Sequence, residues 1–314
     1  MENKLMDSVL ITGGAGFIGR WLAKRCLEAG HAVCIVDNLS TGRIENLMEL
    51  EGRFEFVQAD IRDTAQLVEY MRRNAVQVVY HLAALHYIPF CEAHPYETFE
   101  VNVLGTLSVL EAMRQADISR LVFTSTGAIY PPLDVPLSEE TPVEPQDIYG
   151  LSKWHGETMI AYYQRRYGIR ATVVRLFNTY GAYETNPHLL PHIINTLKQG
   201  VRELTLGNLH PKRDYIYVQD VAEGLYRLGS RPDTLGLFNL GTGIEYSVQE
   251  VVAVISRLLG EPLSVVQDSA RMRPVDKPHQ RADLTKLQAI LGWRPTVDLE
   301  EGLRQWLCHE KLIS

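Results

Sequence analysis

Short apolar segments alternate with longer segments of helical periodicity through the first half of the chain. The apolar runs cover 8–12, 32–37, 54–59, 76–82, 121–125 and 171–177, and several are rich in valine and isoleucine. Between them, helical spacing of apolar residues covers 17–29, 64–73, 95–115 and 149–167. Strands that are apolar on both faces and alternate with helices are typical of a parallel sheet covered on both sides. The pattern therefore predicts an α/β fold with a doubly wound parallel sheet.

The alternation breaks down after residue 177. Residues 180–191 are loop-like, and 204–212 contains glycine and proline. Helical spacing returns at about 218–228 and 248–259, with an apolar run at 237–240 between them. We therefore predict two interwoven domains. The first is 1–179, to which 213–260 returns, and the second is a smaller cap within 180–314, made of 180–212 and 261–314.

The composition is that of an ordinary globular protein, with 314 residues, 46% hydrophobic and 22% charged. A net charge of -7 argues against nucleic acid as a partner, because the phosphate backbone would be repelled. The chain shows neither a signal peptide nor an apolar run of membrane-spanning length, so we expect a cytoplasmic protein without a membrane partner. No metal is expected, because metal-ligand spacing is absent among the four cysteines, Cys26, Cys34, Cys91 and Cys308.

A glycine-rich turn follows the first predicted strand and opens the first predicted helix. It reads T-G-G-A-G-F-I-G over residues 12–19, with Gly13, Gly14, Gly16 and Gly19. Glycines allow close backbone approach, and a helix N-terminus offers N–H groups to a pyrophosphate. Asp37 ends the second predicted strand about 20 residues further on, where a carboxylate accepts bonds from ribose hydroxyls. A glycine turn alone could be purely structural, but this context predicts a Rossmann dinucleotide site.

Asp37 also indicates which dinucleotide is bound. A carboxylate at this place repels the 2′-phosphate of NADP, so the sequence favours NAD. Arg43 lies nearby and could neutralise such a phosphate.

Tyr149 and Lys153 lie four residues apart on a predicted helix, so their side chains share one face. A neighbouring ammonium favours the ionised form of a phenol, which could then abstract a proton. Thr126 ends the fifth predicted strand, at the edge of a parallel sheet where ligands bind, and its hydroxyl could share the proton route. An ordinary tyrosine and lysine on an amphipathic helix are the alternative interpretation. The preceding glycine turn and strands favour the catalytic one.

Further motifs extend over nearly the whole chain. They are D-N-L-S-T-G at 37–42, D-I-R-D at 60–63, H-L-A-A at 81–84, N-V-L-G-T at 102–106, Y-G-L-S-K at 149–153, R-L-F-N-T-Y-G at 175–181, R-D-Y-I-Y-V-Q-D-V-A at 213–222 and L-G-W-R-P at 291–295. In order and spacing the chain resembles the extended short-chain dehydrogenase/reductase family, in its nucleotide-sugar epimerase and dehydratase branch. The resemblance implies NAD as cofactor and a nucleoside-diphosphate sugar as substrate, with a UDP-sugar expected.

The resemblance also implies site residues. The catalytic ones are Tyr149, Lys153 and Thr126. Expected at the cofactor, besides Tyr149 and Lys153, are Gly13, Gly16, Phe17, Ile18, Gly19, Asp37, Asn38, Ser40, Thr41, Gly42, Asp60, Ile61, Leu82, Ala83, Ala84, Asn102 and Thr124. Expected at the substrate are His86, Thr126, Tyr149, Asn178, His188, Leu189, Arg213, Arg273 and Asp276. The two arginines suit a diphosphate, because guanidinium forms paired bonds to phosphate oxygens; surface ion pairs with Asp214 and Asp276 are the alternative.

The family further implies the course of the reaction. Tyr149 removes a sugar hydroxyl proton while hydride passes to NAD, which gives a keto-sugar and NADH. Dehydratases of this branch usually carry an Asp-Glu pair just after the threonine, and decarboxylases commonly carry a Glu, whereas this chain has Gly127 and Ala128 there. We therefore expect epimerisation, most often at C4, of a UDP-hexose or UDP-hexuronate. A 4,6-dehydratase, a decarboxylase and a non-catalytic NAD-binding sensor are the alternatives.

Some positions depart from the family pattern. His86 and Cys91 lie in a predicted loop where small polar residues are frequent, and His86 could face the sugar or be a bystander. His188 occupies a position where asparagine is common, and Val275 replaces the glycine usual in R-P-G-D. The resemblance also implies a homodimer that forms through the helices at 95–115 and 149–167.

Overall fold

The computed structural model describes residues 7–50, 52–271 and 277–314. The chain forms two compact units that alternate along the sequence. The first consists of Met1–Ile129, Val143–Leu176 and Ala222–Phe238, and the second of Tyr130–Pro142, Phe177–Val221 and Asn239–Ser314. After residue 176, the chain returns to the first unit once more, at 222–238.

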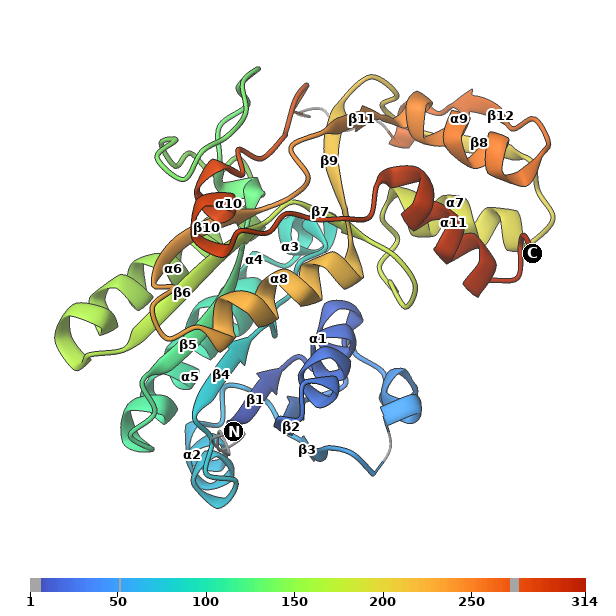
Figure 1. Cartoon of the computed structure of the whole chain (residues 1–314). Helices are drawn as coiled ribbons and strands as arrows, with labels where there is room; N and C mark the ends of the chain where they lie inside the picture. Colours follow the sequence, from blue (N-terminus) through green and yellow to red (C-terminus); the bar gives the residue numbers. More distant parts are fainter. Residues whose placement is uncertain (1–6, 51, 272–276) are drawn as a thin grey trace. The chain divides into compact units, whose positions relative to one another are not determined.

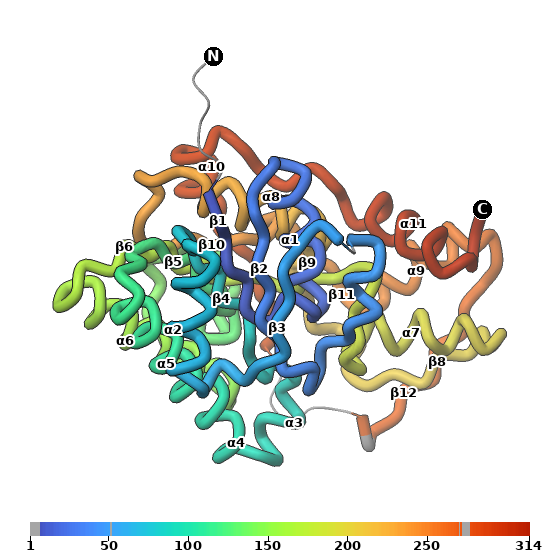
Figure 2. The backbone as a smooth tube through the Cα atoms, turned by 90° about the horizontal axis from the view of Figure 1, so that it is seen from below, coloured from blue at the N-terminus to red at the C-terminus, as the bar shows by residue number. Residues whose placement is uncertain are grey.

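A seven-stranded sheet forms the centre of the first unit, with the order β10-β6-β5-β4-β1-β2-β3 (Figures 1 and 2). Its strands are β1 (Ser8–Thr12), β2 (Ala32–Asp37), β3 (Glu55–Gln58), β4 (Val78–His81), β5 (Arg120–Thr126), β6 (Arg170–Leu176) and β10 (Gly236–Leu240). Strands β1 to β6 pair in parallel with their neighbours. The predicted doubly wound α/β fold is confirmed, and the reversal of strand order at β1 and β4 marks the edge where such sheets bind ligands.

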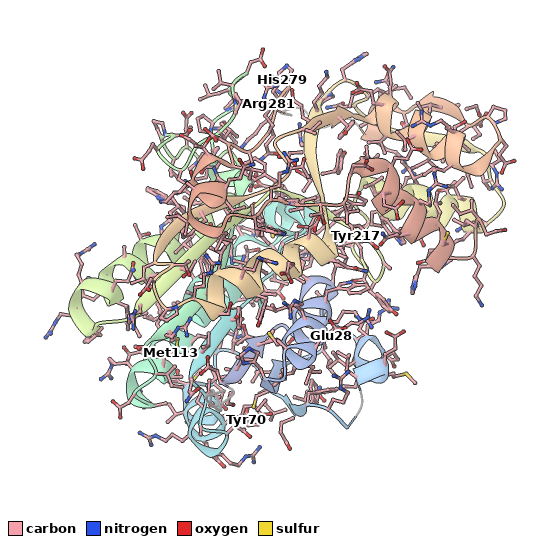
Figure 3. All side chains as sticks on the ribbon, viewed as in Figure 1. Glu28, Tyr70, Met113, Tyr217, His279 and Arg281 are labelled. Atoms are coloured by element: carbon pink, nitrogen blue, oxygen red, sulfur yellow. The ribbon has the colours of Figure 1, made fainter. Side chains whose placement is uncertain are left out.

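Helices cover both faces of this sheet because its strands are apolar on both sides. On one face, α2 (Thr64–Arg73), α5 (Gly105–Gln115) and α6 (Ile148–Tyr167) enclose a core that includes Tyr70 and Met113 (Figure 3). On the other face lie α1 (Phe17–Glu28) and the α8 residues of this unit, since Arg25 on α1 bonds Glu223 on α8 (Val218–Ser230).

The helix expected over 95–115 is interrupted. It consists of α4 (Pro95–Phe99), a π-helical turn (Glu100–Leu104) and α5. Asn102 lies in the wide turn, where its side-chain amide bonds Leu85 and Ser152. π-Helical turns of this kind are frequent at functional sites. Short helical segments elsewhere in the first unit are η1 (Ile44–Leu50), α3 (Ile88–Ala93) and η3 (Gly127–Ile129).

The second unit contains two small sheets, one of three strands in the order β11-β9-β7 and one of two strands, β12 and β8. Its elements are β7 (Asn178–Tyr180), α7 (Leu189–Lys198), β8 (Glu203–Leu206), β9 (Lys212–Tyr217), β11 (Glu245–Ser247), α9 (Val248–Leu259), β12 (Ser264–Gln267), η4 (Ser269–Arg271), α10 (Thr285–Leu291) and α11 (Leu299–His309). Across the described parts of both units, every helix is too short or too polar to cross a bilayer.

Candidate active site

The glycine-rich turn between β1 and α1 has a backbone that side chains would disrupt. Gly13 has φ +72°, and a Cβ there would lie 2.8 Å from the backbone nitrogen of Ala83. A Cβ on Gly19 would lie only 2.1 Å from the carbonyl oxygen of Gly13. The turn therefore requires glycine at both positions and brings the chain after β4 against it.

Helix α1 begins directly after this turn, with Gly16 as its N-cap. Within the described chain, neither a side-chain cap nor an acidic residue in the first turn competes for the N–H groups of its first turn. Uncapped N–H groups and the positive end of the helix dipole form an anion site. The predicted contacts from Phe17 and Ile18 thus lie where the pyrophosphate of a dinucleotide would fit.

Asp37 ends β2 beside this turn and is buried. Its carboxylate accepts bonds from the backbone nitrogens of Ala15 (3.0 Å) and Leu39 (2.8 Å). Burial raises the pKa of Asp37, although these two bonds act in the opposite direction. A Cβ on Gly42 would lie 2.9 Å from both carboxylate oxygens of Asp37. A side chain at position 42 would therefore crowd this carboxylate, and glycine avoids that contact. The position suits a ribose diol.

Asp60 lies close to this region, and its carboxylate accepts a bond from the side-chain amide of Asn38 (3.1 Å). Hydrogen bonds from Arg62 lower the pKa of Asp60 to about 2, against a smaller effect of burial. Asn38 also accepts a bond from the backbone nitrogen of Ser40. Thr41 and Ser40 are exposed, and Ile61 is buried.

Thr126 at the end of β5 contacts Tyr149 near the start of α6, and Lys153 lies one helical turn beyond Tyr149. Asp147 caps α6 by accepting a bond from the backbone nitrogen of Gly150 (2.7 Å). A Cβ on Gly150 would lie 3.2 Å from the carbonyl oxygen of Ala128, so the helix start packs closely on the short turn η3 that follows β5. The Thr126 hydroxyl accepts a bond from the backbone nitrogen of Ala128 and forms a hydrogen bond with Tyr149.

Burial controls the protonation of this pair. It raises the pKa of Tyr149, while the Thr126 hydrogen bond favours the phenolate. Lys153 is only 2% exposed, and its Nζ lies 4.1 Å from the centre of the Phe123 ring. Burial lowers the pKa of Lys153 to about 7, while Glu157 acts to raise it. The ammonium is thus close to its titration point near neutral pH.

Glu157 belongs to a buried ion pair that the sequence did not predict. Its carboxylate accepts two bonds from Arg175 on β6, at 3.0 and 2.7 Å, and one from the hydroxyl of Ser125 on β5. The Arg175 and Glu157 side chains are 4% and 12% exposed. Glu157 lies one helical turn beyond Lys153, and this four-residue spacing was the available signal.

His81 links the end of β4 to the catalytic helix through buried hydrogen bonds. The Thr106 hydroxyl donates to the carbonyl of Asn102 (2.6 Å) and therefore accepts from Nε2–H of His81 (3.0 Å). Nδ1 then accepts from the hydroxyl of Thr12 (2.7 Å), whose oxygen accepts the backbone nitrogens of Leu82 and Ala83. Burial, with a smaller contribution from Lys153, lowers the pKa of His81 to about 3, so the ring stays neutral.

Asn102 continues this chain of bonds. Its side-chain amide exchanges two bonds of 2.8 Å with the backbone of Leu85 and donates to the hydroxyl of Ser152 (2.9 Å), which donates to the carbonyl of Tyr149. The predicted cofactor residue Asn102 thus braces the segment after β4 against α6. Thr124, another predicted cofactor residue, donates to the carbonyl of His81.

His86 directly follows Leu85 on that braced segment. Burial lowers the pKa of His86, with a smaller contribution from Lys153, so its imidazole is neutral at neutral pH. Cys91 was expected in a loop but lies buried in α3, where its thiol donates to the carbonyl of Leu85.

The predicted substrate residues other than His86, Thr126 and Tyr149 belong to the second unit. Asn178 begins β7 and is exposed, and Arg213 lies on the neighbouring β9, where it donates to the carbonyls of Lys212 and Lys277. His188 is the N-cap of α7, Leu189 is its first residue, and His188 lies 4.0 Å from the carboxylate of Glu184. Arg273 and Asp276 lie outside the described residues.

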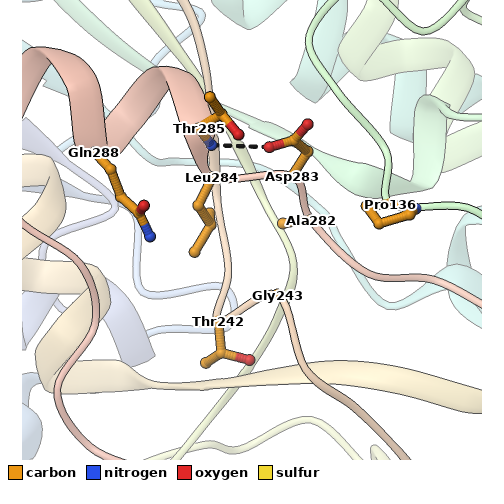
Figure 4. A pocket seen from close by; sticks show the side chains of 8 residues that line it. All are labelled: Pro136, Thr242, Gly243, Ala282, Asp283, Leu284, Thr285 and Gln288. Atoms are coloured by element: carbon orange, nitrogen blue, oxygen red, sulfur yellow. Dashed lines mark hydrogen bonds between the residues drawn. The ribbon is translucent and has the colours of Figure 1, made fainter.

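Asp214 has a structural role, because its carboxylate holds together backbone segments of the second unit. It is fully buried and accepts bonds from the backbone nitrogens of Thr242, Gly243 and Ala282 and from the Thr242 hydroxyl, between 2.6 and 3.0 Å. These three residues line a surface hollow of the second unit with Pro136, Asp283, Leu284, Thr285 and Gln288 (Figure 4). These hydrogen bonds satisfy the Asp214 carboxylate, so it does not need the ion pair with Arg213 that the sequence allowed.

The second unit also contains a cluster of possible metal ligands. Ligand atoms of Asp134, Glu245 and His279 lie within 4.8 Å of one another. Glu245 already bonds His279 and Arg281, which are labelled in Figure 3. A guanidinium at the same carboxylate makes this an ion-pair network.

The fold and the first unit's site define a dinucleotide-binding α/β enzyme with a Tyr-Lys pair. The family model described as GDP-mannose 4,6 dehydratase matches residues 10–306. A putative UDP-glucose 4-epimerase from Methanocaldococcus jannaschii is 36% identical over 95% of this chain and 96% of its own length. The chain therefore belongs to the extended short-chain dehydrogenase/reductase family, in its nucleotide-sugar epimerase and dehydratase branch, as the motifs predicted.

Solved structures agree with this assignment. The structure of UDP-glucose 4-epimerase from Thermus thermophilus in complex with NAD matches with a TM-score of 0.88 and 33% identity, over 97% of this chain and 99% of that one. UDP-glucose 4-epimerase from Thermotoga maritima, solved with UDP-glucose, matches with a TM-score of 0.89 and 30% identity, over 97% and 98%.

Proposed function

We propose that this protein is an NAD-dependent epimerase that inverts C4 of a UDP-hexose or UDP-hexuronate. The observation that carries the proposal is the contact of Thr126 with Tyr149 at the binding edge of the sheet, one helical turn before the buried Lys153. The names of the relatives, which are UDP-glucose 4-epimerases, support the same activity.

NAD fits the first unit because the turn at Gly13 and Gly19 excludes side chains, and the start of α1 offers N–H groups. Asp37 would accept the ribose hydroxyls and repel a 2′-phosphate. NAD, when bound, supplies a hydride acceptor and donor for the sugar carbon.

The chain's own residues move the proton. Tyr149 removes the proton of the sugar hydroxyl and later returns it. The Lys153 ammonium favours the phenolate, because an opposite charge nearby lowers the pKa of a phenol. The Thr126 hydroxyl donates a hydrogen bond to the phenolate oxygen. The bond that it accepts from the backbone nitrogen of Ala128 orients the hydroxyl for this.

The segment after Thr126 favours epimerisation over elimination. Gly127, Ala128 and Ile129 form a short helical turn without an ionisable side chain. An acid that could expel water from a neighbouring carbon, as a dehydratase requires, is missing at these positions. In the second unit we assign Asn178, Arg213 and Arg273 to the diphosphate, and His188, Leu189 and Asp276 to the rest of the substrate.

A panel of UDP-, dTDP-, GDP- and CDP-sugars, followed by mass spectrometry and NMR, tests this function. An epimerase gives an isomer of unchanged mass with an inverted C4 centre. Loss of water would identify a dehydratase, and loss of carbon dioxide a decarboxylase. Bound NAD with no turnover of any sugar would favour the sensor.

The helices around the site also support a homodimer. Tyr96 on α4, Leu104 in the π-helical turn, and Trp154 and Tyr162 on α6 are large apolar side chains that are exposed, Tyr96 to 78%. Trp154 and Tyr162 belong to one stripe of α6, since residues eight apart lie two turns apart along a helix. Sedimentation of the wild type and of Trp154→Glu tests this, and a wild-type monomer would contradict it.

A further inference from the structure

The Glu157 ion pair fixes the middle of α6 to two strands of the sheet. Ser125 and Arg175 are register partners on adjacent parallel strands, so their side chains lie on the same face. Both bond the Glu157 carboxylate. Gly156 contributes to the close approach, since a Cβ there would lie 2.7 Å from the Phe123 ring, the ring over which Lys153 lies.

Residue 125 directly precedes Thr126, and Glu157 lies two helical turns from Tyr149. The strand end thus contacts α6 twice, through Ser125 and Glu157 and through Thr126 and Tyr149. A shift of α6 along β5 would change both contacts together. A displacement of about 1 Å can cost roughly 100-fold in rate when groups must be aligned.

We propose that Glu157 is a positioning residue that seats α6 on β5 and β6 and, balanced by Arg175, sets the charge of Lys153. This inference rests on the proposed function for the role of the Tyr149–Lys153 pair.

The charges around the pair make the proposal specific. Besides Glu157, the titratable groups that interact with Tyr149 or Lys153 are Asp147 at the N-cap of α6, His81 on β4, His86 after β4 and Cys91 on α3. Among the residues that the structure describes, Glu157 is the acid that interacts with Lys153. Its carboxylate also forms a two-bond ion pair with Arg175.

Opposite substitutions should therefore have opposite effects on Lys153. Glu157→Gln removes the anion that acts to raise the pKa of Lys153, so this pKa should fall by about one unit. Arg175→Met leaves the Glu157 anion, so that pKa should rise by about one unit. The double variant is neutral and should return to within a few tenths of the wild-type value, which is about 7.

The titration is measured by NMR of protein labelled with ¹³C at the lysine ε-carbons, with the Lys153 signal assigned through Lys153→Arg. Because this readout needs no sugar, it remains valid even if no substrate turns over. Shifts of the same sign in both single variants, or no shift in either, would overturn the charge role. If a single variant fails to fold, the double variant and wild type still test the seating role.

Steady-state kinetics tests the seating of α6. In the double variant, kcat should fall about tenfold with KM within about twofold, because alignment is lost while the charge is restored. A wild-type kcat in that folded variant would refute the seating role. Glu111→Gln is the matched control, because Glu111 also contacts α6, through the Tyr163 hydroxyl, but at its far end. It should change neither the Lys153 pKa nor kcat.

Discussion

His81 gives the sharpest prediction for stability. The neutral ring accepts a bond from Thr12 at Nδ1 and donates to Thr106 at Nε2. Protonation would place a hydrogen on Nδ1 against a hydroxyl oxygen that already accepts two backbone N–H groups. The folded protein therefore resists protonation of His81, whose pKa burial lowers to about 3.

The size of the effect follows from linkage. An unfolded histidine has a pKa of about 6.5, so its protonation at about pH 5 stabilises the unfolded state by about 2 kcal/mol. The folded state gains almost nothing at that pH, whatever its pKa below about 4. The contribution of neutral His81 is thus present above pH of about 6.5 and is lost as the pH falls toward 3.

His81→Gln tests this, because the amide can keep both hydrogen bonds and does not titrate. Urea unfolding of both proteins, at about pH 7.5 and about pH 5, gives the loss of unfolding free energy in each, and the wild type should lose about 2 kcal/mol more. Other groups, such as Glu184, whose pKa burial raises to about 7, titrate in both proteins and cancel. Equal losses in the two proteins would refute the reasoning.

Three further substitutions address the site. Tyr149→Phe should retain the fold and NAD binding but lower kcat by about 100-fold or more, and near wild-type turnover would remove Tyr149 from its role. Asp37→Ala should weaken NAD binding and reduce the ratio of NAD affinity to NADP affinity, as measured by calorimetric titration with each cofactor. An unchanged affinity ratio would show that Asp37 does not discriminate between the two cofactors. Gly19→Val should weaken NAD binding at least tenfold, since even a Cβ there would lie 2.1 Å from the Gly13 carbonyl oxygen, and calorimetry giving wild-type affinity would contradict this.

The sequence was most informative where a function depends on neighbours along the chain. The glycine turn, the strand before it and the helix after it are continuous, so periodicity and glycine spacing predict them together. Tyr149 and Lys153 share a helix face because they are four residues apart. The ends of helices were less predictable where tertiary hydrogen bonds compete with the local helical preference. In the π-helical turn, the side-chain amide of Asn102 forms hydrogen bonds with residues that lie 17 and 50 positions away in the sequence.

The amino-acid sequence by itself determined the α/β class, NAD as the cofactor and the spacing of Tyr149 and Lys153, because each depends on local spacing and on residue type. Tertiary structure alone decided which polar residues become buried partners. Glu157 meets Ser125 and Arg175, and His81 meets Thr12 and Thr106, only after separate strands and helices pack together. Periodicity carries no information on such pairs, since their contact depends on sheet register and burial, and those arise from the packing of the whole unit.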